Sequence, residues 1–463
     1  MGQKAKNASG TIDEKAFAYL KLGRLEVCVK SFGVRRKAMS ESTKTTYRCV
    51  LGFAALLSIG LLVFNTTIIA NADGTIVIET SDPNAKTDGY CSLIEAITNA
   101  NDDAQTYPEC PRGNGADTLI LQAATTYTLT TINNQFDGAN SLPVITSTII
   151  ISGNGATLAR DTAADTPAFR IFYVSSSGKL TLNNVNIRNG KTSGDNNQPG
   201  GGGVYNAGGI VVISASKIIS NTASNGGGIE NFGILAITNS TIDNNLAQFG
   251  GGVLNYDNDY APGSRGEVTI IASTISNNTA VQSGGGIYNA GDIHSGFGYL
   301  RVSNSTVSGN KGDGVVNWGT ATIALSTISQ NDEVGLYTGY MYASTEISNT
   351  LVSGNTLDCD GPLVSGGYNL IQNTSGCEIS GNTQGNITGQ DPHLGPLANN
   401  GGPTLSHALL RASVAINAGD PTFRPPPDYD QRGAEFPRVV GGIVDIGAIE
   451  MPLSSTYLPI ILK

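Results

Sequence analysis

Aromatic and polar residues gather directly after three glycine-rich hexapeptides, and their types suit the recognition of a sugar. The hexapeptides are GGGVLN (250–255), GGGIYN (284–289) and GDGVVN (312–317). The candidate ligand-binding residues that follow them are Tyr256, Asp257, Asp259, Tyr260, Arg265, His294, Phe297 and Trp318. Flat rings stack on the apolar face of a sugar, and polar groups beside them bind its hydroxyls. We therefore predict a carbohydrate-binding surface; the alternative is that the rings only cover the wall of the fold.

Metal and catalytic chemistry have weaker signals in the sequence. Asp257 and Asp259 form an Asp-Asn-Asp stretch that could hold calcium, a weak pattern by itself, and no other cofactor is expected. A polysaccharide lyase needs a strong base beside a clamp on the substrate carboxylate, and a glycoside hydrolase needs two carboxylates about 5 to 9 Å apart. Cations are scarce in the repeats, and only Arg265 lies near several acidic residues. We assign no catalytic residue and keep an extracellular polysaccharide lyase or hydrolase as the alternative function.

An internal repeat must position these residues. Segments of the form GGGxxN, the last one weaker, are spaced by 25, 24, 34 and 28 residues and end at Asn206, Asn231, Asn255, Asn289 and Asn317. A second kind of segment, such as TNSTIDNNLA, lies between them and has a shared apolar position at Ile218, Ile242, Ile275, Val307, Ile328 and Val352. A base period of 21 to 25 residues with occasional insertions is typical of a solenoid.

The content of each unit predicts an all-β fold, a right-handed parallel β-helix over residues 136–384. Short alternating stretches are separated by Asn, Ser and Gly, and three strands with three turns fill roughly 24 residues, one coil stacked ~4.8 Å from the next. Stacking places the five asparagines above one another, where their amides can form a ladder, a purely structural role. The insertions 256–266 and 292–298 should leave consecutive coils at the same corner, so the candidate residues should stand side by side.

Both ends of an open solenoid expose strand edges that must be covered. Residues 73–135 are predicted to form an N-terminal capping region, with a helix in CSLIEAITNAN (91–101). The region 385–450, where the repeat vanishes, is predicted to be a cap or a separate element, followed by a tail at 451–463. Two local disulfides are expected, Cys91 with Cys110 and Cys359 with Cys377. A zinc site is the rival, but the chain has no CxxC and its three histidines are scattered.

The apolar run at residues 50–64 indicates export. It follows Lys44 and Arg48 and precedes Ala70-Asn71-Ala72, the three parts of a secretory signal. We predict a signal peptide over 39–72 with translation starting at Met39, so that 1–38 is a non-functional extension. A membrane anchor is the alternative, although the run barely reaches the ~20 apolar residues of a span. A secreted or cell-surface location follows.

The charge distribution limits the partners. Residues 1–48 hold 11 Lys/Arg and 4 Asp/Glu, which leaves 16 Lys/Arg and 33 Asp/Glu from residue 73 on, a formal charge of about −17. Such an acidic surface cannot neutralise a phosphate backbone and is repelled by anionic lipid, so we expect no nucleic acid and no membrane contact beyond the signal peptide or envelope anchoring. The expected partner is a carbohydrate or another cell-surface component.

Three segments resemble known exported bacterial proteins. Residues 73–133, with CSLIEAITNAN and GADTLIL, resemble the CSLREA-type N-terminal domain, except that Ile94 stands where arginine is usual. The GGGxxN and SNNTA repeats resemble those of polymorphic outer-membrane proteins, and DPHLGPLANNGGPTLSHALL with DQRG (430–433) and DIGAIE (445–450) resembles a choice-of-anchor Q domain. The resemblance implies a right-handed parallel β-helix displayed at the cell surface, with a role in adhesion and no defined catalytic set.

Overall fold

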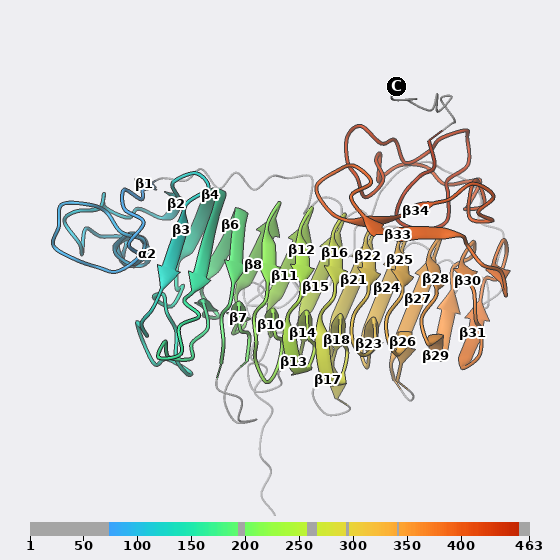
Figure 1. Cartoon of the computed structure of the whole chain (residues 1–463), viewed down its shortest axis with the longest axis horizontal. Coiled ribbons are helices and arrows are strands. Elements are labelled where there is room, and N and C mark those ends of the chain that lie inside the picture. Colours follow the sequence, from blue (N-terminus) through green and yellow to red (C-terminus); the bar gives the residue numbers. More distant parts are fainter. Residues whose placement is uncertain (1–73, 193–199, 257–265, 293–295, 340–341, 453–463) are drawn as a thin grey trace, which may run out of the picture. The chain divides into compact units, whose positions relative to one another are not determined.

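The computed structural model describes residues 74–192, 200–256, 266–292, 296–339 and 342–452. Its strands form a parallel β-helix, a stack of coils in which most strands belong to one 28-stranded sheet (Figure 1). The predicted fold class, an all-β parallel solenoid, is therefore confirmed. The extension 1–38, the signal peptide 39–72 and the end of the tail at 453–463 lie outside the described residues.

Each coil contributes up to three strands, which stack into three rows. The first row follows the glycine triplets and comprises β5 (Phe172–Val174), β7 (Val204–Asn206), β10 (Ile229–Asn231), β14 (Val253–Asn255), β18 (Ile287–Asn289), β23 (Val315–Asn317), β26 (Val334–Thr338) and the start of β29 (Leu357–Ser365). The second row comprises β1 (Gly74–Val77), β2 (Ala116–Ile120), β4 (Thr148–Arg160), β6 (Lys179–Arg188), β8 (Ile210–Ser214), β11 (Ile234–Thr238), β15 (Glu267–Ile271), β21 (Tyr299–Ser303), β24 (Thr320–Ala324), β27 (Ser344–Ser348), the end of β29 and β31 (Cys377–Gly381).

The third row lies one tight turn after the second. It comprises β3 (Thr126–Leu129), the ends of β4 and β6, β9 (Lys217–Ile219), β12 (Thr241–Asp243), β16 (Thr274–Ser276), β22 (Thr306–Ser308), β25 (Thr327–Ser329), β28 (Leu351–Ser353), β30 (Leu370–Ile371) and β32 (Ile387–Thr388). Short extra strands flank the rows: β13 (Leu246–Phe249) with β17 (Thr279–Ser283), and β19 (Gly291–Asp292) with β20 (Gly296–Phe297).

The core is a column of aliphatic side chains that the coils place above one another. Ile242 pairs in register with Ile218 on one side and Ile275 on the other, and all three side chains are fully buried. Val307, Ile328 and Val352 continue the same column. Burying each such side chain contributes about 1.5 to 3 kcal/mol, so the repeated apolar position is the main source of cohesion between coils.

Two asparagine ladders and a serine ladder supply hydrogen bonds to the polar groups of the buried turns. In the predicted ladder, Asn206 Nδ2 donates to Asn231 Oδ1 at 2.7 Å, and the same bond repeats through Asn255 and Asn289 to Asn317. A second ladder, not predicted from the sequence, runs through Asn221, Asn245, Asn278, Asn310, Asn331 and Asn355. A serine column, Ser216, Ser240, Ser273, Ser305 and Ser326, accepts the backbone N–H of the preceding coil.

The N-terminal end is closed by the predicted helix, but the coils begin earlier than residue 136. Helix α2 (Leu93–Asp102) starts with a capping box in which Ser92 Oγ accepts the N–H of Glu95 and the Glu95 carboxylate accepts that of Ser92. The strands β1, β2 and β3 already pair in parallel with the solenoid. Their segments lack the glycine and asparagine repeats, so the start of the solenoid predicted from the sequence, residue 136, lies after its first strands.

Both predicted disulfides are present. Cys91 is bonded to Cys110 with 4.7 Å between their Cα atoms, and Cys359 to Cys377 with 5.2 Å. The first joins the start of the helical cap to the loop that follows it, and the second joins β29 to β31. Each therefore closes a short local loop, as the sequence spacing predicts.

The region after β32 does not cap the last coil; it packs along the third row (Figure 1). The outward side chains of Thr274 and Ser276 are buried there, whereas those of Thr241 and Asp243, one coil earlier, are half-buried. The hydrogen bonds include Thr306 Oγ1 to Gln431 Oε1 at 2.6 Å and Ala448 N to Thr327 Oγ1 at 3.0 Å. Of the two expected alternatives, an end cap and a separate element, the end cap is therefore wrong. Strands β33 (Leu394–Ala398) and β34 (Ser406–Leu409) form its antiparallel hairpin.

A buried ionic network holds this C-terminal region together. Arg432 is bidentate to the Asp430 carboxylate and also donates to the carbonyl of Glu450. Arg438 donates to two backbone carbonyls and lies 3.6 Å from the Glu450 carboxylate. Burial raises the pKa of Glu450 to about 8. These contacts join DQRG to DIGAIE, so these two motifs have a structural role.

Candidate functional site

Aromatic rings follow the outer surface of the first row from coil to coil. Because side chains alternate along a strand, the middle residue of each three-residue strand points outward. In-register pairing therefore aligns Tyr173, Tyr205, Glu230, Leu254, Tyr288, Val316 and Tyr337 in one column. Ring contacts link Phe136, Tyr173, Tyr205, Phe232 and Tyr256, with successive centroids 5.2 to 5.6 Å apart.

The residue after each ladder asparagine occupies the corner next to this column. The N–H groups of Phe232, Tyr256 and Trp318 donate to Asn206, Asn231 and Asn289 carbonyls at 2.8 to 2.9 Å. Tyr256 and Trp318 therefore do occupy the same corner, as predicted. Ala290 occupies this corner in the coil between them, so the two rings are not in adjacent coils. Tyr256 is 41% exposed and Trp318 is 36% exposed.

An open hollow of about 430 Å³ lies over the first row, between this corner and β13. We call it the aromatic groove; it is lined by Asn225, Glu230, Phe232, Phe249, Leu254, Tyr256 and Tyr288. Phe249 ends β13 and contacts the Tyr288 ring edge-on, with centroids 5.7 Å apart. The corner supplies Phe232 and Tyr256, and the outward column supplies Leu254 and Tyr288. The groove thus presents rings on both sides and a single ionisable carboxyl.

Glu230 is that carboxyl, and its surroundings keep it protonated. It is 4% exposed, and its Oε2 accepts the N–H of Gly200 at 2.6 Å. Desolvation by burial raises the pKa of Glu230 to about 8, against the smaller opposing effects of this hydrogen bond and of Arg170. A protonated carboxyl at the edge of an apolar groove can donate a hydrogen bond to a sugar oxygen or transfer a proton to one.

Arg170 lies behind the groove and is held by the protein. Its guanidinium donates to the carbonyls of Gly200 and Asp137 and to Asn140 Oδ1. It also lies 5.0 Å from the centroid of the Tyr205 ring, a cation–π contact. Desolvation by burial lowers the pKa of Arg170, and burial raises the pKa values of Tyr173 and Tyr205. With its side chain 99% buried and occupied by these acceptors, Arg170 supports Glu230 and the rings rather than facing the groove.

The predicted corner residues are only partly described. Asp257, Asp259, Tyr260, Arg265 and His294 lie outside the described residues, so the calcium hypothesis also concerns residues that are not described. Phe297 belongs to β20, which pairs with β19 just after the ladder residue Asn289. Of the eight candidates, Tyr256 and Trp318 are placed with their side chains, and Tyr256 lines the aromatic groove.

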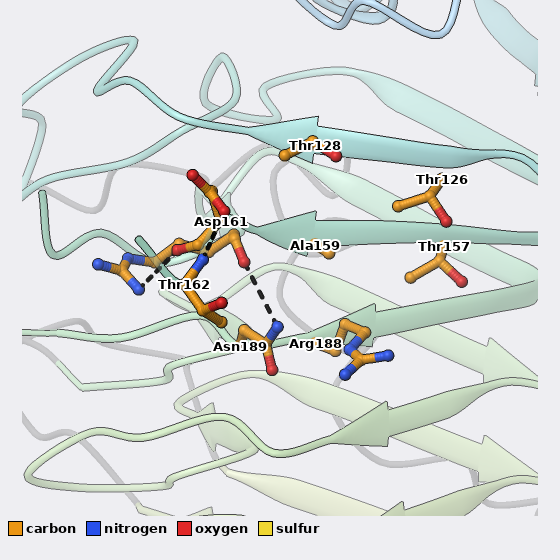
Figure 2. Close-up of a pocket in the computed structure, with 9 residues that line it drawn as sticks. Thr126, Thr128, Thr157, Ala159, Asp161, Thr162, Arg188 and Asn189 are labelled. Carbon is orange, nitrogen blue, oxygen red and sulfur yellow. Dashed lines mark hydrogen bonds between the residues drawn. The ribbon is translucent and has the colours of Figure 1, made fainter. Parts of the chain in front are cut away.

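A second, smaller hollow of about 210 Å³ lies on the third row, toward the N-terminal end (Figure 2). It is lined by hydroxyls of Thr126, Thr128 and Thr157 and by Arg188, from neighbouring strands. Arg160 also lines it, but its guanidinium is bound to the carbonyls of Asp161, Thr166 and Pro167. This hollow is polar and has no aromatic ring, so it suits hydroxyl or carboxylate contacts but lacks the stacking surface of the aromatic groove.

Neither a metal cluster nor a membrane-spanning helix is found in the described part of the chain. No three His, Cys, Asp or Glu side chains of those residues lie close enough together to hold a metal ion. No helix within the same ranges is long and apolar enough to cross a membrane.

Comparisons with known proteins assign no family to the chain. No protein-family model and no curated protein sequence matches the chain. Among solved structures, it is similar to the crystal structure of pectate lyase Pel9A, with 15% sequence identity and a TM-score of 0.42. The similarity covers 82% of this chain and 96% of that one. Similarity at this level establishes no shared activity.

Most residues of the aromatic groove are not among the candidates predicted from the sequence. Glu230 occupies the fifth position of GGGIEN, where the other triplet repeats have Tyr205, Leu254 and Tyr288, so aligning the repeats would have marked it as the exceptional outward residue. Phe249 directly precedes the next hexapeptide, GGGVLN (250–255), at a position that the repeat does not distinguish. Its place beside Tyr288 depends on the pairing of β13 with β17.

Proposed function

We propose that the protein is a secreted or cell-surface β-helix protein that binds carbohydrate in the aromatic groove and acts in surface display or adhesion. The observation that carries this proposal is the arrangement of Phe249, Tyr256 and Tyr288 around one open hollow with a protonated carboxyl, Glu230, at its edge. Ring faces stack on the C–H surfaces of a sugar, and the carboxyl and Asn225 can bind its hydroxyls.

The extracellular location rests on independent observations. The described residues contain two disulfides, a bond type that persists mainly in oxidising compartments. The sequence upstream of them contains a basic flank, a 15-residue apolar run and Ala-Asn-Ala. Sequencing the N-terminus of the protein released by its own host tests this part of the proposal, with Asp73 as the expected first residue.

Glycan binding is tested with the full chain on an array of neutral and acidic polysaccharides. The variants Tyr256→Ala and Tyr288→Ala should each weaken binding of any captured glycan. Tyr90→Ala is the matched control, because Tyr90 is 57% exposed and lies in the N-terminal cap. Unchanged binding by both groove variants would contradict the proposed site.

Cleavage of a polysaccharide is the second candidate function, and one specific observation favours it. A carboxyl with a pKa of about 8 is protonated at neutral pH, as a general acid for glycosidic bond cleavage must be. Within the described lining, Glu230 has no second carboxylate beside it to act as base or nucleophile. A reducing-end assay on the glycans that bind distinguishes the two functions. A protein that cleaves the glycan produces new reducing ends, and Glu230→Gln should abolish their production. A protein that only binds the glycan produces none.

A further inference from the structure

The C-terminal region covers the third row of strands over only part of its length. Its hydrogen bonds to the row begin at the coil of β16 and involve Thr274, Thr306 and Thr327. Toward the N-terminus, over β3, β4, β6 and β9, the same row carries the smaller polar hollow (Figure 2). Arg188 and Lys217 are exposed in this part, which we call the N-terminal third-row face.

In-register pairing determines which side chains stand on this face. The middle residue of each strand segment, from Tyr127 in β3 to Ile218 in β9, is buried in the core, so its two neighbours point outward. The outward residues are Thr126, Thr128, Thr157, Ala159, Asn186, Arg188, Lys217 and Ile219. Two of these eight residues are cations and none is acidic.

The face is basic although the chain as a whole is acidic. Residues 160–217 hold six Lys/Arg and three Asp/Glu, whereas the chain from residue 73 on holds 16 Lys/Arg and 33 Asp/Glu. Lys217 pairs with Asn186, two residues before Arg188 on the neighbouring strand, so the two cations stand on adjacent coils. Within the described ranges, neither side chain forms an ion pair or a hydrogen bond. Both cations can therefore bind an anion.

One acidic residue, Asp161, also lines the hollow, but other groups occupy it. Its carboxylate accepts the N–H of Thr162 at 2.8 Å and the hydroxyl of Thr166 at 3.2 Å. Its charge is opposed by the adjacent Arg160, with which it interacts electrostatically. The Arg160 guanidinium is bound to backbone carbonyls. Arg188 is therefore the cation of the described lining that remains for a ligand.

Threonine hydroxyls surround this cation. Thr157 Oγ1 accepts a hydrogen bond from Asn186 Nδ2 at 3.3 Å, so its own proton remains to be donated. The small side chain of Ala159 lies in register between Thr128 and Arg188, which leaves room for the hollow of about 210 Å³. A guanidinium binds an oxyanion such as a carboxylate through two parallel N–H bonds, and hydroxyls can bind the hydroxyls of a sugar.

We propose that the N-terminal third-row face is a second binding site, for an anionic saccharide whose carboxylate or sulfate groups bind Arg188 and Lys217. Coils stack ~4.8 Å apart, so cations on adjacent coils can hold neighbouring anionic groups of one polymer. Two exposed cations are too few to neutralise a nucleic-acid backbone. The site lies on a different row from the aromatic groove, so it does not depend on the function proposed for the groove.

Polymers with one backbone test the requirement for an anionic group. Dextran, carboxymethyl-dextran and dextran sulfate are each titrated into the full chain at low salt, beside polyglutamate as an anionic polymer without sugar. Carboxymethyl-dextran or dextran sulfate should bind more tightly than both dextran and polyglutamate, and the tighter of the two identifies the anionic group. Absence of binding by both anionic dextrans overturns the proposal, and so does equal affinity for polyglutamate.

Substitutions locate the contact. Arg188→Gln and Lys217→Gln should each weaken binding of the anionic dextran roughly ten-fold, and Arg188→Lys should weaken it less, because the charge is kept and the two-pronged geometry is lost. Lys179→Gln is the matched control, since Lys179 is an exposed cation of the same strand, β6, on the second row. An equal loss in Lys179→Gln overturns the proposal, because the attraction would then be unspecific.

The aromatic groove is separated from this site by a double variant. In the background of Tyr256→Ala, Arg188→Gln should weaken binding of the anionic dextran by the same factor as in the unmodified chain. Disappearance of its effect in that background overturns the second site, because Arg188 would then act through the groove. All the replaced cations are exposed, so the melting temperature should be unchanged and should confirm that each variant is folded.

Discussion

The backbone N–H of Gly200 donates a 2.6 Å hydrogen bond to Oε2 of Glu230, across a gap that only glycine permits. A Cβ atom at residue 200 would lie 2.6 Å from that oxygen and 2.0 Å from the carbonyl of Asn225. Glycine is therefore required at residue 200, directly before the GGGVYN hexapeptide (201–206), because of its contact with the candidate site. It fixes a carboxyl that burial keeps protonated at the edge of the aromatic groove.

The first prediction concerns the pH dependence of stability. The pKa of Glu230 is about 8 in the folded chain and near 4.5 when unfolded, so the folded state holds a proton that the unfolded state releases. The free energy of unfolding should therefore fall as pH rises from about 5 to 8. Glu230→Gln should remove part of this fall, by at most about 1.4 kcal/mol per pH unit.

Urea unfolding of both proteins at several pH values measures this difference. Glu450, whose pKa is also raised to about 8, contributes a fall of the same sign to both proteins, so only their difference reports on Glu230. The charged and titratable groups facing Glu230 are Arg170 and Tyr205, and neither ionises differently in this range. Parallel curves for the two proteins would contradict the assignment of a protonated Glu230.

The second prediction separates the core and ladders from the surface. Ile275→Ala should lower the free energy of unfolding by about 2 to 5 kcal/mol, because it leaves a cavity in a fully buried column. Asn278→Ala should cost about 1 to 3 kcal/mol, because Asn245 and Asn310 each lose a buried partner. Gln282→Ala, on the exposed side of β17, should change it by less than about 0.5 kcal/mol. Thermal or urea unfolding measures all three, and equal effects would refute the ladder's structural role.

The third prediction concerns the attachment of the C-terminal region. The His407 ring contacts the Ser308 hydroxyl and the Gly395 carbonyl, each at 2.8 Å, and is buried. Because a carbonyl only accepts, Nδ1 carries the proton and Nε2 accepts from Ser308. Burial lowers the pKa of His407, so the neutral ring stabilises the fold fully above about pH 6.5, and this contribution is lost as the pH falls through the lowered pKa of the folded state, because burying the charged imidazolium is costly.

Hydrogen exchange tests the consequence. Amides of residues 394–409 should exchange faster at pH 5 than at pH 7, after correction for intrinsic rates, while those of β10 and β14 should not. His407→Gln should reduce this pH dependence. Equally faster exchange across the whole solenoid at pH 5 would contradict the prediction, because the low pH would then destabilise the chain at sites other than His407.

The sequence was sufficient for the fold because its signals are local and repeated. The apolar position from Ile218 to Val352, the asparagines after each triplet and the two close cysteine pairs each recur within or between neighbouring coils. Packing of the C-terminal region along the third row joins Thr306 to Gln431, 125 residues apart, and no repeat encodes such a contact. In the sequence, this packing is indicated locally by the small outward Thr and Ser residues of β16, β22 and β25.

The candidate site was predicted in part for the same reason. The corner position that follows each ladder asparagine is set by the repeat, so Tyr256 and Trp318 could be assigned to the same corner, although not to adjacent coils. The groove also needs Phe249 from β13 and Tyr288 from the next coil, whose contact depends on how the coils stack. The repeat alignment marks Glu230 as the exceptional outward residue, but its burial and the raised pKa that follows from it depend on the folded structure.

The central claim is that the aromatic groove binds carbohydrate, and calorimetric titration tests it most directly. The full chain is titrated with a glycan that it captures on the array, beside Tyr256→Ala, Tyr288→Ala, Trp318→Ala and the control Tyr90→Ala. The two groove variants should weaken binding by about 1 to 3 kcal/mol with little change in melting temperature, and Trp318→Ala, outside the groove, should weaken it less. Full affinity in both groove variants, with their folds intact, would contradict the claim.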